Sequence, residues 1–173
     1  MWRGVWAGLI LVLALPAPVA APMPTSLGRQ QVAQADGQEP FVSPLKTVLT
    51  VVRAFDPPPH PYGPGHRGVD LFVSPGELVH AAGAGTVRHA GPVAGRPVVS
   101  IQHAAGLITT YEPVESMLST GDRVSAGQPI GEAMRGHPGC TSEACLHWGA
   151  RRDGVYVDPL TLLGRLRLRL LPW

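Results

Sequence analysis

The sequence predicts an all-β fold, an antiparallel β-sandwich or barrel-like domain, on three observations. The chain has 173 residues, of which 45% are hydrophobic and 15% charged, a balance typical of one globular domain with a sizeable core. Its 21 glycines and 19 prolines favour short strands and many turns over long helices. From Phe41 onward, short runs rich in β-branched residues alternate with these turn residues. The formal net charge of +2 lacks the strongly basic field of nucleic-acid-binding proteins, so no nucleic-acid partner is expected.

The N-terminal segment, residues 1–21, has the pattern of a secretory signal peptide. Arg3 precedes an apolar run over residues 5–15, and small residues and prolines end the segment. A transmembrane anchor is the alternative, but this run is shorter than the ~20 residues that a spanning helix needs. We expect a secreted or cell-wall (extracytoplasmic) protein, membrane-tethered if the signal is not cleaved. Residues 22–40 are polar and lack an apolar period, which indicates a flexible linker.

Residues 41–164 form the predicted β domain. The predicted strands cover residues 47–55, 78–81, 85–89, 98–103, 107–111, 123–126 and 145–151. Two of them form the second halves of copies of one motif, Ser-x-Gly-acid-x-Val-x-Ala, at Ser74–Ala81 and Ser119–Ala126. Each copy predicts a turn that leads into a strand.

The C-terminal tail, residues 165–173, begins with strictly alternating arginine and leucine. This alternation favours an edge strand with a basic outer face. An interfacial segment that touches an anionic polymer or lipid is the alternative.

Four side chains in two separate motifs carry metal-ligand chemistry. His66 and Asp70 are four residues apart around Gly68, which disfavours a helix, and on a strand both would face the same side. By the same parity, Cys145 and His147 would share one face of a later strand. Two imidazoles and one carboxylate form the ligand set of an open catalytic zinc site, whose fourth position holds water. Spacing alone favours a surface turn pair for His66 and Asp70 over a metal site.

The two cysteines, Cys140 and Cys145, are five residues apart. Export to an oxidising compartment allows them to form a disulfide, which we expect to shape the loop locally. The alternative is that Cys145 is a thiolate ligand that closes a structural zinc site. Export and the nearby Cys140 favour the disulfide.

Five motifs together resemble the lysostaphin-like zinc peptidase family. In chain order they are His66-Arg67-Gly68-Val69-Asp70-Leu71, Gly85-Thr86-Val87, Ile101-Gln102-His103, Gly121-x-x-Val124-x-x-Gly127-x-x-Ile130-Gly131 and Leu146-His147-Trp148-Gly149. The resemblance covers about Val48 to Leu163 and implies an antiparallel β core of the duplicated hybrid motif type, with a groove across it. It implies one Zn²⁺ held by His66, Asp70 and His147. It also implies a metalloendopeptidase that acts on the peptide stems or cross-links of bacterial peptidoglycan.

Two departures from the family pattern bear on catalysis. Where the family has the first histidine of H-x-H, this chain has Cys145. Where the family has a histidine two residues after a tyrosine, Tyr111 is followed by Glu112 and Pro113. Neither a proline nor a disulfide-bonded sulfur supports general acid–base catalysis, so we expect weak or no turnover. The alternative function is a catalytically degenerate domain that binds peptidoglycan or regulates another cell-wall hydrolase by contact.

Two residues are candidate substitutes for the missing catalytic groups. His137 lies in a Gly/Pro loop that the disulfide would hold near the last strand, although a solvated loop residue is the favoured interpretation. Tyr62 precedes His66 and would stabilise a developing oxyanion, or else pack as a loop aromatic. Glu112 is expected to face away from the side of Tyr111 and to be a poor substitute. We interpret His103 as a packing or hydrogen-bonding residue.

Overall fold

The computed structural model describes residue 1 and residues 40–60 and 62–164, and the fold below refers to this part of the chain. The predicted signal peptide, linker and C-terminal tail lie outside these residues, apart from Met1 and Pro40. None of the helices in the described ranges is long and apolar enough to cross a membrane.

Strands make up nearly all the regular structure of the described residues. In chain order these are β1 (Val51–Arg53), β2 (Gly68–Phe72), β3 (Leu78–His80), β4 (Gly85–Val93), β5 (Arg96–Gln102), β6 (Leu107–Glu112), β7 (Val114–Ser116), β8 (Arg123–Val124), β9 (Pro129–Ala133), β10 (Cys145–Arg152) and β11 (Val155–Val157), followed by the 3₁₀ helix η1 (Pro159–Leu163). The strand pairings are antiparallel throughout. The predicted all-β antiparallel fold class is therefore confirmed.

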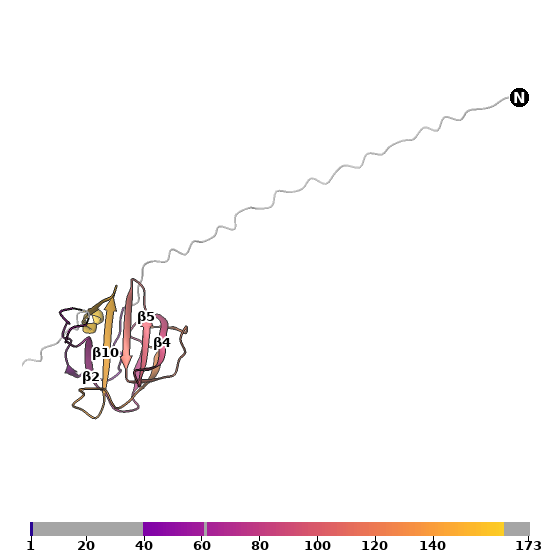
Figure 1. Cartoon of the computed structure of the whole chain (residues 1–173). Coiled ribbons are helices and arrows are strands. Elements are labelled where there is room, and N and C mark those ends of the chain that lie inside the picture. Colours follow the sequence, from indigo (N-terminus) through magenta and orange to yellow (C-terminus); the bar gives the residue numbers. More distant parts are fainter. Residues whose placement is uncertain (2–39, 61, 165–173) are drawn as a thin grey trace, which may run out of the picture. The chain divides into compact units, whose positions relative to one another are not determined.

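The strands form two sheets. The larger, 8-stranded sheet has the order β1-β2-β10-β6-β5-β4-β8, with β11 paired to β10, and Figure 1 shows β2, β10, β5 and β4 running across it. The smaller, 3-stranded sheet has the order β3-β9-β7. One buried hydrophobic cluster takes residues from both sheets, including Leu71, Ile101 and Trp148 from the larger and Val79 and Ile130 from the smaller. The core therefore joins the two sheets.

Strand β10 shows how the sequence separates the two faces of the larger sheet. Leu146, Trp148 and Ala150 are at most 2% exposed and belong to the core face. His147 and Gly149, at the intervening positions, line a cleft on the opposite face. Because successive side chains of a strand alternate, one strand supplies both the core and the cleft.

The repeated motif forms the turns that it predicts, and a third turn of the same kind follows. In the first, Glu77 N donates to Ser74 O over 3.0 Å, while a Glu77 carboxylate oxygen accepts from Ser74 N over 3.2 Å. The pairs Ser119/Asp122 and Ser125/Gln128 repeat both hydrogen bonds. The third residue of each turn is a glycine with positive φ, at 76° to 100°, a conformation that glycine adopts without the strain of a side chain. These turns lead into β3, β8 and β9.

The strand boundaries differ from prediction in one place that bears on the site. The sequence placed His66 and Asp70 on one strand, but β2 begins at Gly68. His66 instead forms an isolated bridge with Asp56, whose backbone N–H donates to His66 O over 3.0 Å. The bend before it uses Gly65, at φ 146°. His66 therefore reaches the sheet from a loop.

Candidate metal centre

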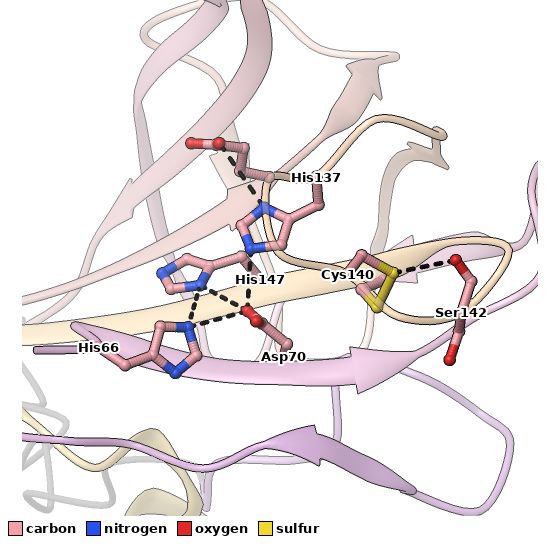
Figure 2. The surroundings of a disulfide bond; sticks show 8 residues. His66, Asp70, His137, Cys140, Ser142 and His147 are labelled. Carbon is pink, nitrogen blue, oxygen red and sulfur yellow. Dashed lines mark hydrogen bonds and ion pairs between the residues drawn. A yellow bond between two sulfur atoms is a disulfide. The ribbon is translucent and has the colours of Figure 1, made fainter.

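The site is built where β2 and β10 pair. His147 of β10 lies directly opposite Asp70 of β2, so both side chains leave the sheet on the same face. His66 approaches from the loop before β2, and His137 from the loop between β9 and β10. Figure 2 shows the three imidazole rings gathered around the Asp70 carboxylate.

The donor atoms of these four residues converge. Asp70 Oδ1 lies 3.0 Å from His66 Nε2, 2.8 Å from His147 Nδ1 and 3.1 Å from His137 Nε2. His66 Nε2 and His147 Nδ1 are themselves 3.1 Å apart. All four ligand atoms lie within 4.8 Å of one another. The structure thus brings together the three predicted ligands and adds His137.

Asp70 is fully buried in this cluster, with 0% of its surface exposed. Burial alone would raise its pKa, but the hydrogen bonds of His137 and His147 and their electrostatic interaction with the carboxylate outweigh this and hold the pKa of Asp70 well below its usual range. Its second oxygen, Oδ2, is buried without a hydrogen-bond partner in the described part of the chain. A bound cation would stabilise a buried carboxylate whose second oxygen has no protein partner.

The arrangement of the ring nitrogens also favours a bound cation. His66 Nδ1–H donates to Ala54 O over 2.7 Å, so in the neutral ring Nε2 presents its lone pair to Asp70 and His147. A carboxylate oxygen and imidazole lone pairs that face one point repel one another unless a cation lies between them. The bond to Ala54 is also the second-sphere hydrogen bond that orients metal-ligating histidines. Imidazole nitrogens with one carboxylate suit Zn²⁺, and these residues therefore fit the ion that the family resemblance implies.

A disulfide joins Cys140 and Cys145, with their Cα atoms 5.7 Å apart. Figure 2 places this bond beside the four-residue cluster. Because the Cys145 sulfur is bonded to Cys140, it is not a thiolate, and the alternative of a Cys145–zinc bond has no support in the structure. The disulfide instead ties the loop that carries His137 to the first residue of β10.

Glu112 lies on the face of the larger sheet that carries the site. It faces away from Tyr111, as expected, but Tyr111 faces the core, and the opposite face is that of the site. Glu112 Oε1 lies 3.8 Å from His137 Nδ1 and accepts from Arg96 Nε. The prediction that Glu112 faces away from Tyr111 is confirmed, but the inference that this makes Glu112 a poor substitute does not follow, because the face opposite Tyr111 is the one that carries the site.

The structure does not bring Tyr62 to the cluster. Its side chain is 95% exposed, and it is absent from the described residues that line the two clefts at the site. Neither of the two interpretations weighed for it, oxyanion stabilisation or loop packing, is supported by a contact in the described part of the chain.

Two adjoining clefts border the cluster and share Arg67, Glu112 and His147. The larger, about 360 Å³, runs along the outer face of the sheet. Its lining includes Arg88, Arg151 and Tyr156. The smaller, about 280 Å³, lies over His66 and His137. The metal centre therefore opens onto a groove with arginine side chains along it.

The sequence profile of Peptidase family M23 matches residues 64–159, more than half of the chain. This range contains all four residues of the cluster. With an antiparallel β fold and the His/Asp cluster in place, the chain belongs to peptidase family M23, the lysostaphin-like family predicted from its motifs.

Individual relatives extend this assignment. An uncharacterized protein of Mycobacterium tuberculosis is 51% identical over 133 residues, which cover 75% of this chain and 53% of that protein. The chain thus spans about half the length of this relative. The structure of the SpoIIQ–SpoIIIAH pore-forming complex matches with 27% identity and a TM-score of 0.62, over 73% of this chain and 92% of the matched chain. A zinc-containing peptidase from Vibrio cholerae matches with 25% identity and a TM-score of 0.58, over 73% of this chain and 40% of its own.

Proposed function

We propose that this chain is an exported, zinc-binding domain that recognises bacterial peptidoglycan and hydrolyses it weakly or not at all. The observation that carries the proposal is the convergence of His66, Asp70 and His147. The family resemblance adds that Pro113 and Cys145 stand where catalytic histidines would be expected. Family membership supports cell-wall peptides as the ligand. The M23 relatives include an Escherichia coli lipoprotein, which supports an extracytoplasmic location.

The chemistry of the groove supports a peptide ligand with free carboxylates. Arg88 and Arg151 line the larger cleft, next to His147 of the metal centre. Guanidinium groups bind carboxylates through paired, charge-assisted hydrogen bonds. The stem peptides of peptidoglycan carry such carboxylates, so the groove and its ligand have complementary charge.

The residues present favour binding over turnover. Zn²⁺ held by His66, Asp70 and His147 would supply Lewis-acid activation of a peptide carbonyl. Proton transfer would still require a positioned general acid or base, whose loss typically lowers the rate by ~10²–10⁴-fold. The Cys145 sulfur lies in a disulfide and Pro113 does not titrate, so neither supplies that group.

The test measures binding and hydrolysis on the same purified protein. Insoluble peptidoglycan is incubated with the zinc-loaded chain, and bound protein and released peptide fragments are both quantified. We expect binding, and fragment release at least ~10²-fold below that of an intact family enzyme. The double variant Arg88→Ala/Arg151→Ala should bind more weakly, whereas the exposed-residue control His60→Ala should not change. Release at the rate of an intact enzyme, or no binding, would overturn the proposal.

A second candidate function is an active zinc endopeptidase that uses different catalytic groups. It is favoured by Glu112 and His137, which lie 3.8 Å apart at the rim of the metal centre. Under this alternative, fragment release by the wild type would be high and would fall in both Glu112→Gln and His137→Ala. Low release by the wild type would instead support the binding function.

A protein partner is compatible with the same binding function. The matched SpoIIQ chain was solved in a complex with SpoIIIAH, which shows that a relative of this domain assembles with another protein. We propose another cell-wall hydrolase as the partner here, held near its substrate by a domain that binds peptidoglycan. Release of fragments by such a hydrolase, measured with and without this chain, tests that extension.

A further inference from the structure

We propose that His137 Nε2 is a fourth protein donor to the metal, which closes the coordination shell formed by His66, Asp70 and His147. This inference rests on the proposed zinc binding and deepens it. It assigns His137 a role different from the general base considered for it above. It also makes the centre a structural metal site, in which no coordination position is left for a substrate carbonyl.

The position of the ring carries the inference. His137 Nε2 lies 3.1 Å from Asp70 Oδ1, within the 2.8–3.1 Å that separate the other donors of the cluster. The His137 ring stacks on that of His147, with centroids 5.2 Å apart and planes at 21°. Donors of an ideal tetrahedral zinc site are about 3.3 Å apart, as follows from bonds of about 2.0–2.1 Å. His137 is thus spaced as a ligand.

The far side of the His137 ring is arranged like that of a bound ligand. Its side chain is only 9% exposed, and Nδ1 faces the Glu112 carboxylate at 3.8 Å. Arg96 in turn donates to Glu112 and fixes that carboxylate. Zinc-ligating histidines commonly donate their other ring N–H to a carboxylate, and Glu112 faces Nδ1 from the matching side, at a distance longer than a hydrogen bond. On the opposite side of the cluster, His66 Nδ1 makes such a hydrogen bond to Ala54 O.

The loop is restrained in a way that keeps His137 in place. Cys140 N donates to His137 O over 3.2 Å, which forms a turn from the histidine to the cysteine. The disulfide then fixes Cys140 to Cys145, two residues before His147 on β10. His137 is therefore linked to His147 by a short covalent path through the disulfide.

A closed shell has a functional consequence. Structural zinc sites are held by four protein ligands, whereas catalytic sites have three and leave one position open. With His137 as the fourth ligand, the centre belongs to the first kind. This would account for low turnover independently of Pro113 and Cys145, and it leaves the arginine-lined groove free to bind a peptide.

X-ray absorption spectroscopy of the zinc-loaded whole chain tests the inference without any activity measurement. The contribution of imidazole rings to the absorption spectrum gives the number of histidine ligands. We expect three imidazoles in the wild type and two in His137→Ala, with zinc affinity lowered at least ~10-fold in the variant. Glu112→Gln should retain three imidazoles but bind zinc more weakly. His60→Ala, an exposed histidine away from the cluster, is the matched control and should match the wild type in both measurements.

The outcomes separate this inference from the proposed function. Two imidazoles in the wild type, with zinc and peptidoglycan still bound, would overturn the role of His137 and leave the proposed function intact. A zinc affinity unchanged in His137→Ala would do the same. Because the wild-type spectrum alone gives the ligand count, the test does not depend on the folding of a variant. A wild type that takes up no zinc would overturn both proposals.

Discussion

Two histidine-containing polar regions on opposite faces of the larger sheet differ in whether their hydrogen bonding is complete. On the core face, His103, Thr109 and Tyr111 form a buried chain of hydrogen bonds. On the cleft face, His66, His137 and His147 surround Asp70. Both regions are shielded from solvent and both contain imidazoles, yet only the first satisfies its polar atoms with protein groups.

The hydrogen-bond network on the core face ends on a backbone atom at each side. Ala82 N donates to the Tyr111 hydroxyl over 2.8 Å, and the Tyr111 and Thr109 hydroxyls are 3.0 Å apart. Thr109 Oγ1 lies 2.7 Å from His103 Nε2, and His103 Nδ1 donates to Ala84 O over 2.8 Å. Burial raises the pKa of Tyr111 to about 12, against the smaller opposing effect of these hydrogen bonds, so the network is uncharged at neutral pH.

The cleft cluster lacks this closure. Asp70 Oδ2 and His137 Nδ1 have no hydrogen-bond partner among the described residues, and several donor atoms face one point. A complete network stabilises the fold by itself, whereas an incomplete one gains most from a bound cation. The two regions should therefore respond differently to substitution and to metal removal.

The largest expected effect is that of Asp70→Asn on zinc binding. Loss of the charged ligand should lower zinc affinity by more than the ~10–100-fold expected for an outer-sphere partner. With zinc at 1,000 times its Kd, the wild type gains about 4 kcal/mol of stability, and the variant should lose most of that gain. Calorimetric zinc titration and denaturant unfolding measure the two quantities. An equal loss of stability with zinc and with chelator would contradict a role specific to the metal.

Gly68→Ala should affect stability and zinc affinity together. A Cβ at this position would lie 2.5 Å from Trp148 O and 2.8 Å from His147 Nε2, so β2 and β10 must separate to admit it. We expect a loss of unfolding free energy at or above the upper end of the ~1–3 kcal/mol typical of overpacking. Because Asp70 and His147 lie opposite each other on these strands, zinc affinity should fall as well. Gly76→Ala meets open space and carries the cost of a positive φ, which Gly68 does not have, and as a control it should leave zinc affinity unchanged.

Tyr111→Phe probes the complete network in isolation. It leaves the buried Ala82 N–H without its acceptor and removes one partner of Thr109, at about 1–2 kcal/mol of stability. Zinc affinity should not change, since the substituted side chain faces the core. The same unfolding and titration experiments apply. A reduced zinc affinity would show that the two faces of the sheet are coupled.

The fold was predictable because its signals are local. The turns are encoded by a serine, a glycine two residues later and a side chain that accepts a hydrogen bond one residue after that. Along β10, Leu146 and Trp148 face the core and alternate with His147 and Gly149 at the cleft. Very short strands such as β7 and β11 were missed because three residues give no period. Strand parity was the wrong reason to predict His66 as a metal ligand, because His66 lies on a loop. Its assignment as a ligand came from the family motif.

His137 and Glu112 show what sequence reasoning lacks. A histidine between Gly136 and Pro138 carries no periodic signal, and its place at the cluster follows from the disulfide and from Glu112 on another strand. The approach of Cys140 to Cys145 was the one signal that could have favoured His137 over a solvated loop residue. The positions of His137 and Glu112 at the cluster depend on tertiary contacts between β6, β10 and this loop, which the local sequence does not encode.

The smallest expected effect is the pH dependence that His103 contributes to stability. Burial lowers the pKa of His103 below its ordinary 6.5, against a smaller opposing effect of the Ala84 carbonyl. Its other ring contacts, the Thr109 hydroxyl and the edge of Phe41, do not titrate. The unfolded chain thus binds a proton more readily than the folded one. The contribution of His103 is fully present above pH 6.5 and is lost as the pH falls from 6.5 through the lower, folded-state pKa.

We therefore compare wild type and His103→Gln by denaturant unfolding at pH 8 and pH 5, with chelator present so that zinc does not contribute. The wild type should lose more stability between the two pH values than the variant, because the variant lacks this titrating ring. All other titratable groups are common to both proteins, so only the contribution of His103 remains in the difference. His60→Ala, whose ring is exposed, should behave as the wild type. Equal losses in wild type and His103→Gln would show that His103 titrates alike in the folded and unfolded chain, and would contradict the prediction.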